Sequence, residues 1–451
     1  MPPKISIIGA GSGTFSLALI RDLCLTPNLA GATISLMDID PQRLDSAYSV
    51  CKRYARELGF SMRLEKTMER RQSLEGADFV INTALVQGHH RLQEGWAIAQ
   101  KYGFNWGSSF HVLYDEPFWV NFYQFRLFES IVEDMLSICP DAWQLLVANP
   151  VLAGVTYLGR RYPQARLVGL CHGYSGVYSV AKTLGLDPEH VTFEIPGVNH
   201  FVWMTRFYHQ GQDAFPILER WIAEEFPRLR AAGKLHTDFC LSPKVVDLYQ
   251  RFGALPIGDT SHWSGAAWPW WYHSDSATEQ EWGENPVLGW EDYIRGSAHN
   301  AIEFQRVAAD PSIRLTQLFP PVKSGEQMIP IIESIACDIP RVVYGTNILN
   351  RSSFVPGIPA DFEIEVPTLV SKRGIQGIQT SGLPPALIAH ALRDRVAPVT
   401  LELEAYQKGS RELLVQLILM DHWARSAAQA RSFVEEILAL PHYTEMRNHY
   451  Q

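Results

Sequence analysis

The chain has 451 residues, a formal net charge of −9, and apolar and charged fractions that are ordinary for a soluble globular protein. This length allows two or three domains, and an acidic balance without basic patches argues against nucleic acid as a partner. Six cysteines are scattered without a Cys-x-x-Cys pair, and the N-terminus lacks the pattern of a signal peptide. Since no apolar run is long enough to span a bilayer either, we expect a soluble, cytoplasmic protein.

The first segment predicts a dinucleotide-binding turn. Lys4 to Ile8 is a β-branched run typical of a buried strand, and the helical pattern after the glycines stops before Pro27. In such a strand–turn–helix unit Gly9 permits the tight turn and Gly11 lets the backbone approach a pyrophosphate, which the helix N-terminus then binds. The residues expected to bind the cofactor are Gly9, Gly11, Ser12, Gly13, Thr14 and Phe15. The match to G-x-G-x-x-G is partial, because Thr14 stands where the third glycine is expected.

An acidic residue follows the second predicted strand, Thr33 to Met37. Asp38 lies about 20–25 residues past the glycines, where a carboxylate accepts from a ribose hydroxyl and would repel a 2′-phosphate, so NAD is favoured over NADP. Alternatively, Asp38 or Asp40 only caps the next helix, for which Asp40-Pro41 is a typical start. Both roles can hold with different residues.

Strands that alternate with helices predict a parallel, doubly wound, Rossmann-like sheet and an α/β fold. The predicted elements are strands at residues 77–84, 144–148 and 166–170 and a long amphipathic helix at 118–138. Asn82, Asn149 and Cys171 fall at strand ends and are expected to line one crevice. Thr83 ends its strand in a small polar side chain, as expected beside a nicotinamide ribose.

The pattern changes near residue 190 and predicts a C-terminal α+β domain packed on the first. Residues 191–195 and 200–208 suggest antiparallel strands with Pro and Gly between them. The predicted closing helices lie near residues 384–395, 399–418 and 424–438. We therefore expect an NAD-binding domain at residues 1–190 and a catalytic or substrate domain at 191–451.

Two polar residues at the ends of apolar segments predict a metal site. Cys171 follows the predicted strand at 166–170, and His200 ends a short apolar segment that begins at Phe193. Thiolate and imidazole together suit Mn, Fe, Co, Ni or Zn, and the remaining coordination positions would belong to water or substrate oxygens. In the alternative interpretation Cys171 is an inert buried thiol and His200 is a packing histidine.

Four motifs occur in order along the chain. They are Gly9-Ala10-Gly11-Ser12 with Asp38, Asn149-Pro150, Cys171-His172-Gly173-Tyr174 and Gly197-Val198-Asn199-His200. Together they resemble glycoside hydrolase family 4, the NAD- and metal-dependent glycosidases related in fold to lactate and malate dehydrogenases. The resemblance implies a homodimer or a homotetramer.

The resemblance implies a redox-assisted elimination in place of the usual two-carboxylate hydrolysis. NAD⁺ takes a hydride from C3 of the sugar, and a base then removes the acidified C2 proton. The glycosidic oxygen leaves, water adds at C1, and the hydride returns. In family terms Cys171 and His200 hold the metal, most favourably Mn(II), and Asn149 and Asn199 contact the substrate.

The acid and the base are expected from two different segments. His172 falls where the family places its general acid, and an imidazolium can donate a proton near neutral pH. Its alternative role is packing or orientation. Asp259 is the best match for the general base and Tyr272 is the second choice, although an Asp in such a loop is equally typical of a turn.

The substrate class follows from the motif after the metal cysteine. Cys-His-Gly-x resembles the uronidase branch of the family, which implies an α-linked glucuronide or galacturonide. A uronate needs a cation for its carboxylate, and Arg91 is the candidate. The alternatives are an α-glucosidase or α-galactosidase of the same family, an NAD-dependent dehydrogenase of a hydroxy acid or polyol, and a non-catalytic NAD sensor.

Overall fold

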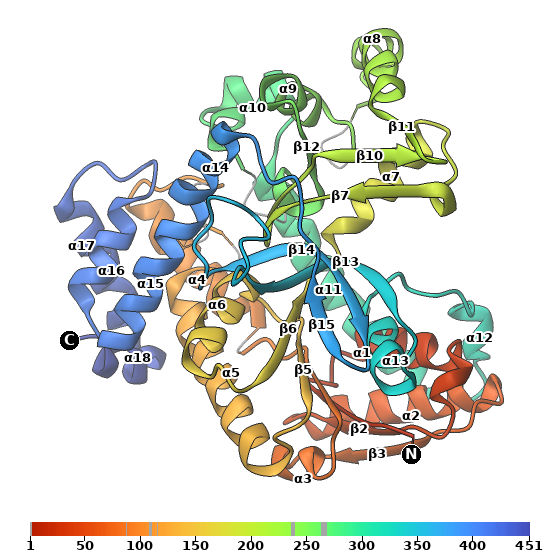
Figure 1. Ribbon diagram of the computed structural model, residues 1–451. Helices are drawn as coiled ribbons and strands as arrows, with labels where there is room; N and C mark the ends of the chain where they lie inside the picture. The colour runs from red at the N-terminus through yellow and green to blue at the C-terminus, as the bar shows by residue number, and fades with distance from the viewer. Residues whose placement is uncertain (1, 87, 108–110, 115, 236–239, 263–267) are drawn as a thin grey trace.

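Twelve strands form one sheet through the molecule, and six of them make the predicted parallel part (Figure 1). The computed structural model describes residues 2–86, 88–107, 111–114, 116–235, 240–262 and 268–451. The parallel strands lie in the order β3-β2-β1-β4-β5-β6, which is the order of a doubly wound dinucleotide-binding fold and confirms the predicted fold class. Their bounds are β1 Lys4–Ile8, β2 Thr33–Met37, β3 Arg63–Thr67, β4 Phe79–Asn82, β5 Trp143–Leu146 and β6 Arg166–Leu170.

Helices connect these strands on both faces of the sheet. They are α1 Gly13–Cys24, α2 Pro41–Glu57, α3 Arg70–Leu74, α4 Gly88–Lys101, α5 Phe118–Ile138, α6 Val151–Arg161 and α7 Gly176–Thr183. Strands β1, β2 and β6 and helix α5 have the bounds that their apolar patterns predict. Strand β3 was not predicted, because its sequence Arg-Leu-Glu-Lys-Thr lies at the sheet edge and is largely accessible to water.

The second half of the chain continues the same sheet with antiparallel strands. Strand β13 pairs with β6, and the order then runs β13-β14-β8-β9-β12, with β15 beside β14. A separate sheet has the order β11-β10-β7, in which β7 and β10 are antiparallel. The single strand predicted at residues 200–208 is wrong in its extent, because the segment divides into β9 in the main sheet and β10 in this one. The bounds are β7 Val191–Glu194, β8 Gly197–Val198, β9 Phe201–Met204, β10 Arg206–His209, β11 Gln212–Asp213, β12 Leu255–Ile257, β13 Arg341–Leu349, β14 Glu363–Ser371 and β15 Gly374–Gly377. The predicted domain boundary at residue 190 thus falls just before β7, in a chain whose main sheet spans both halves.

The helices of the second half form the outer part of the molecule. They are α8 Phe215–Ala231, α9 Pro243–Phe252, α10 Ser276–Trp282, α11 Pro286–Ala309, α12 Leu315–Leu318, α13 Met328–Cys337, α14 Pro385–Ala391, α15 Ala397–Lys408, α16 Arg411–Leu419, α17 Ala427–Ala439 and α18 Thr444–His449. The single helix expected at 399–418 is wrong. Gly409 ends α15 in a left-handed conformation with φ 61°, and Ser410 caps α16. Within the described ranges, every helix is too short or too polar to cross a membrane.

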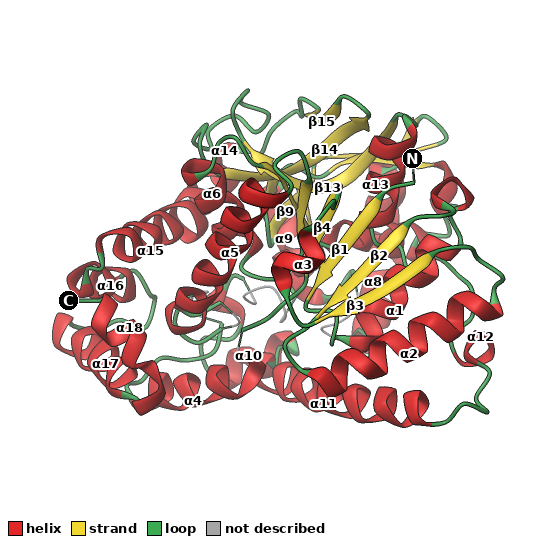
Figure 2. Cartoon of the chain, turned by 90° about the horizontal axis from the view of Figure 1, so that it is seen from below, coloured by secondary structure: helices red, strands yellow, loops and turns green. Residues whose placement is uncertain are grey.

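Helices lie on both faces of the sheet (Figure 2), and the two largest apolar clusters of the described residues fill the space between these layers. The larger one joins α4, α5 and α6 to the C-terminal helices, where the rings of Trp119 and Phe433 lie 5.9 Å apart. The other fills the space between β1, β2, α1 and α13. Helix α11 crosses from the second half onto α1, and Phe304 of α11 lies against Gly13. A Cβ at Gly13 would come within 2.2 Å of Phe304 Cε1, so Gly13 is required for this contact.

We predict that Gly13→Ala destabilises the protein by about 1–3 kcal/mol, because the added methyl group overpacks the contact with Phe304. Chemical denaturation without added cofactor measures the change. Gly296→Ala is the control, since a Cβ there on α11 meets nothing within 4 Å. If Gly13→Ala unfolds at the wild-type denaturant concentration, the close packing of α11 on α1 is wrong.

Candidate active site

Three potential metal ligands come together from separate elements. Cys171 directly follows β6, His200 lies in the short connection between β8 and β9, and Asp259 lies in the 3₁₀ turn Gly258–Thr260 after β12. The sulfur of Cys171 lies 3.9 Å from Asp259 Oδ2, and His200 Nε2 lies 3.6 Å from the same oxygen. One ligand atom from each residue falls within 4.8 Å of the others. We call Cys171, His200 and Asp259 the ligand group.

This arrangement suits a transition metal. Sulfur, imidazole nitrogen and carboxylate oxygen each bind such ions at about 2.0–2.3 Å, so atoms separated by these distances can share one ion. Three protein ligands leave further positions for water or substrate oxygens, as in a Lewis-acid site. Cys171 and His200, which the sequence predicts as metal ligands, lie close to Asp259, which the sequence predicts as the general base.

Burial sets the charge state of the ligand group. It raises the pKa of the Cys171 thiol well above its ordinary value, and the negative charges of Glu365 and Asp259 raise this pKa further. Burial also lowers the pKa of His200, so its imidazole is neutral, which is the form that binds metals. A bound cation would replace the thiol proton, because a coordinating thiol is deprotonated.

Three carboxylates that the sequence analysis missed lie around the ligand group. Glu116 Oε1 is 3.9 Å from His200 Nδ1. Burial raises the pKa of Glu363 well above its ordinary value and that of Glu365 to about 8. Both glutamates lie on β14, in a strand that otherwise reads as an apolar core element.

Asn199 is bound to these carboxylates. Its backbone N–H donates to Glu363 Oε2 at 3.1 Å, and its side-chain Nδ2 donates to Glu365 Oε2 at 3.2 Å. Its side chain also lowers the pKa of the Cys171 thiol in part. Asn199 is therefore part of the framework around the ligand group.

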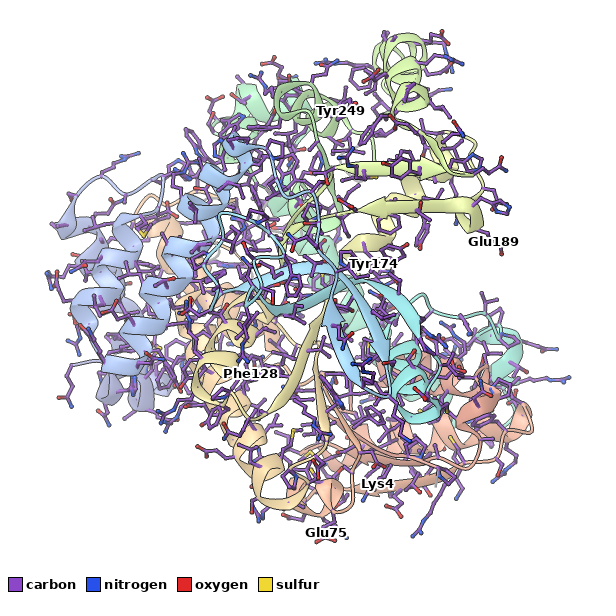
Figure 3. The ribbon with its side chains drawn as sticks, viewed as in Figure 1. Lys4, Glu75, Phe128, Tyr174, Glu189 and Tyr249 are labelled. Carbon is purple, nitrogen blue, oxygen red and sulfur yellow. The ribbon has the colours of Figure 1, made fainter. Side chains whose placement is uncertain are left out.

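His172 has a carboxylate partner from a distant loop. Its Nδ1 lies 3.5 Å from Glu326 Oε1, and the hydrogen bond to Glu326 raises the pKa of the imidazole. The side chain is 45% exposed, so a substrate can reach it. Tyr174, near the middle of the molecule in Figure 3, donates its hydroxyl to the carbonyl of Gly325 and thereby anchors the same loop.

The two candidate bases have different surroundings. Asp259 belongs to the ligand group. Tyr272 is 1% exposed and donates its hydroxyl to Asp247, and burial raises its pKa. A tyrosine committed in this way is poorly placed to take a proton from a substrate.

The glycine turn has the shape of a phosphate-binding loop. Gly9 has φ 87°, and a Cβ there would come within 2.7 Å of the Ala84 backbone. The N–H of Gly11 donates to Asp38 Oδ2 at 2.7 Å, so the turn and the acidic residue are joined directly. Ser12 is the N-cap of α1, and the exposed Thr14 and half-buried Phe15 stand in its first turn, whose N–H groups have no acceptor within the helix.

The two aspartates after β2 divide their roles. Asp40 caps α2, because its carboxylate accepts from the N–H groups of Gln42 and Arg43. Asp38 instead faces the glycine turn. Thr83 lies beside the same turn, and its hydroxyl donates to the carbonyls of Ile8 and Gly9 at 3.1 and 3.2 Å.

The remaining predicted residues lie at different places. Asn149 is half-buried after β5, and its carbonyl accepts from Gln124 Nε2 at 2.6 Å. The Arg91 guanidinium lies over the rings of Tyr123 and Tyr443, at 5.7 and 5.4 Å from their centres. Tyr123 belongs to α5 and Tyr443 to the turn Pro441–Tyr443, so the Arg91 side chain packs against α5 and the C-terminal segment.

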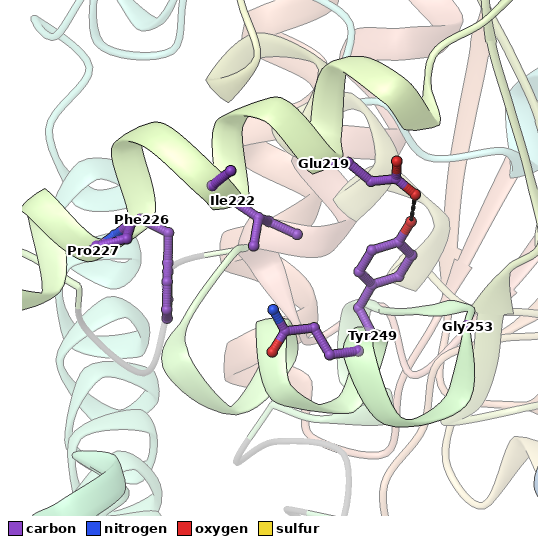
Figure 4. Close-up of a pocket in the computed structure, with 8 residues that line it drawn as sticks. Glu219, Ile222, Phe226, Pro227, Tyr249 and Gly253 are labelled. Atoms are coloured by element: carbon purple, nitrogen blue, oxygen red, sulfur yellow. Dashed lines mark hydrogen bonds between the residues drawn. The ribbon is translucent and has the colours of Figure 1, made fainter.

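A surface cavity of about 590 Å³ lies between α8 and α9 (Figure 4). Tyr249 donates a hydrogen bond to Glu219 across it, at 3.2 Å. Its lining consists of Glu219, Ile222, Ala223, Phe226, Pro227, Tyr249, Gln250 and Gly253. None of these belongs to the ligand group or to the glycine turn.

Comparison with known proteins gives consistent matches along the whole chain. Residues 4–186 match the model "Family 4 glycosyl hydrolase", and residues 195–424 match "Family 4 glycosyl hydrolase C-terminal domain". An α-glucosidase of Erwinia rhapontici is 27% identical, with 93% of this chain and 94% of that protein covered. An α-galacturonidase of Lachnoclostridium phytofermentans is 24% identical, with 85% and 84% covered.

A solved structure shares the fold. A 6-phospho-α-glucosidase from gut microorganisms, in complex with NAD and Mn²⁺, superposes with a TM-score of 0.78 at 18% identity. The superposition covers 97% of this chain and 98% of that one.

We predict that Cys171→Ser lowers the affinity for Mn(II) or Co(II) by more than about 100-fold. Removing a side chain that binds the metal should cost more affinity than removing one that only supports a ligand, which costs about 10–100-fold. Isothermal calorimetry on the metal-free protein measures the affinity. Cys337→Ser should leave this affinity unchanged, because Cys337 ends α13 and its thiol donates to the carbonyl of Asn28. Wild-type affinity in Cys171→Ser would rule out the thiol as a ligand.

Proposed function

The chain belongs to family 4 of the glycosyl hydrolases, and from this we propose that it cleaves α-linked uronides, as an α-glucuronidase or α-galacturonidase, with NAD and a divalent metal, most favourably Mn(II). The observation that carries this proposal is the ligand group, because a thiol, an imidazole and a carboxylate within 4.8 Å form a site for a transition metal in a dinucleotide-binding fold. The solved relative that binds NAD and Mn²⁺ supports the same pair of cofactors.

The residues present fit both cofactors. The glycine turn packs so closely on Ala84 that a Cβ at Gly9 would clash with it, and Asp38 beside this turn would accept from a ribose hydroxyl of NAD. Cys171 and His200 would hold the metal. When bound, NAD⁺ supplies a hydride acceptor for C3 of the sugar and the metal supplies a Lewis acid for its hydroxyl oxygens.

The side chains of this protein would move the protons. Asp259 would accept the proton from C2 of the sugar, as a carboxylate that lies beside the metal ligands Cys171 and His200 without binding the ion itself. His172 would give a proton to the leaving glycosidic oxygen, and its partner Glu326 favours the protonated imidazole that this step needs. Asn149 would contact sugar hydroxyls.

The uronide assignment is supported by the Cys171-His172-Gly173 motif and by the α-galacturonidase relative. Arg91 remains the predicted partner of the substrate carboxylate, although its guanidinium packs over Tyr123 and Tyr443. An α-glucosidase or α-galactosidase is the second candidate, favoured by the α-glucosidase relative with 27% identity. We further propose that the protein works as a homodimer or a homotetramer.

We predict that nitrophenyl α-glucuronide or α-galacturonide releases nitrophenol with NAD⁺ and Mn²⁺ under reducing conditions, without net NADH. Absorbance at separate wavelengths follows the aglycone and the nicotinamide. Faster cleavage of the neutral α-glucoside or α-galactoside would select the second candidate. Steady NADH formation without released aglycone would instead identify a dehydrogenase of a hydroxy acid or polyol, and absence of both reactions would favour a non-catalytic NAD sensor.

We predict that Asp259→Asn lowers turnover by about 100- to 10,000-fold, the range for loss of a general base. It should also abolish incorporation of solvent deuterium at C2 of the sugar. Metal affinity should stay within a few-fold, because the Asn carbonyl keeps one oxygen in place. A parallel loss of metal affinity would show that Asp259 acts as a ligand and that the base is another residue.

A further inference from the structure

The hairpin between β8 and β9 presents His200 in an unfavourable backbone conformation. Val198 pairs with Phe201, so Asn199 and His200 form a two-residue loop. His200 has φ 56°, in the left-handed region that side-chain-bearing residues adopt only at a cost. Such strain persists only where the surrounding structure fixes the backbone. The contacts of this loop therefore determine whether His200 keeps its position.

Those contacts are made by Asn199. It is 1% exposed, and Glu363 and Glu365 accept from its backbone N–H and its side-chain Nδ2. Its side chain also acts on the Cys171 thiol, whose pKa it lowers in part. One residue therefore joins His200, through the chain, to the carboxyl groups of β14 and also influences Cys171.

The anchor is rigid because it belongs to the sheet. Glu365 of β14 pairs with Gly197 of β8 on one side and with Asn347 of β13 on the other. Asn347 in turn pairs with Gly169 of β6, two residues before Cys171. Glu365 thus lies in the ladder that joins the strands carrying the two ligands.

We infer that Asn199 is a positioning residue, which Glu363 and Glu365 anchor and which holds Cys171 and His200 at the spacing that a metal ion requires. This rests on the proposed function only in taking Cys171 and His200 as the metal ligands. The role differs from the substrate contact expected from sequence, since both the backbone and the side chain of Asn199 are bound to protein groups. Outer partners of this kind set the orientation and basicity of metal ligands.

The test is binding of Co(II) to the metal-free full-length protein, measured by calorimetry and by the thiolate-to-Co(II) charge-transfer absorption. Asn199→Ala should lower the affinity on the order of 10–100-fold, as loss of an outer partner does, and weaken the absorption per bound ion. The absorption reports the Cys171–metal bond, which a general loss of stability would not change.

Asn350→Ala is the matched control. Asn350 is also fully buried, and its side chain makes three hydrogen bonds to the backbone of Val355 and Ile358. Both variants should lose thermal stability, but only Asn199→Ala should lose Co(II) affinity. If Asn199→Ala does not fold, Glu365→Gln decides, because Gln keeps one oxygen as an acceptor for Asn199 but replaces the other oxygen with an NH₂ group, which cannot accept a hydrogen bond or ionise when a cation binds. Glu365→Gln should also lower the Co(II) affinity, by a smaller factor than Asn199→Ala does.

Each outcome has one meaning. A folded Asn199→Ala, or failing that a Glu365→Gln, with wild-type affinity and absorption overturns the inference. Loss of glycoside turnover in Asn199→Ala with intact Co(II) binding also overturns it and assigns Asn199 to the substrate. A wild-type protein that does not bind Co(II) would refute the proposed metal site itself, which separates the two failures.

Discussion

The approach of Cys171 to His200 depends on two antiparallel strands, β13 and β14, which lie between β6 and β8 in the sheet. A doubly wound parallel sheet alone would end at β6 and leave the thiol at its border. The antiparallel strands make β6 an interior strand and bring in the hairpin that carries His200. Strand β14 also carries Glu363 and Glu365, so one structural extension provides both the geometry and two of the carboxyl groups of the site.

The site is rich in carboxyl groups. Glu116, Glu363 and Glu365 surround a ligand group that itself contains a carboxylate and a thiol. Burial opposes ionisation of Glu363 and Glu365, because a charge in a poorly solvated interior is costly. A divalent cation would favour ionisation of these carboxyl groups and of the thiol. It would also reduce the electrostatic repulsion that the anionic uronate proposed as substrate would meet at this site.

The sequence predicts the parts of this protein in which local pattern and tertiary structure agree. The strand at Lys4–Ile8, the helix at Phe118–Ile138 and the Asp40 cap follow from apolar periodicity and capping chemistry. Glu326 and Glu365 could not be predicted, because they reach His172 and Asn199 across more than 150 residues and nothing local marks them. Gly13 shows that a residue can have a second role that the sequence does not predict. The glycine motif predicts cofactor binding for Gly13, and the structure also shows it packed against Phe304 of a distant helix.

The shared sheet has a consequence for how the protein is made. Thr346 and Asn347 of β13 pair with β6, so a ribosome must add 177 residues after Leu170, from residue 171 to residue 347, before that border is closed. During this interval β6 exposes unpaired N–H and C=O groups, which are a template for pairing with another nascent chain. An expressed fragment that stops near residue 190 would keep the border open permanently. The halves that look separable along the sequence are therefore one unit for expression and engineering.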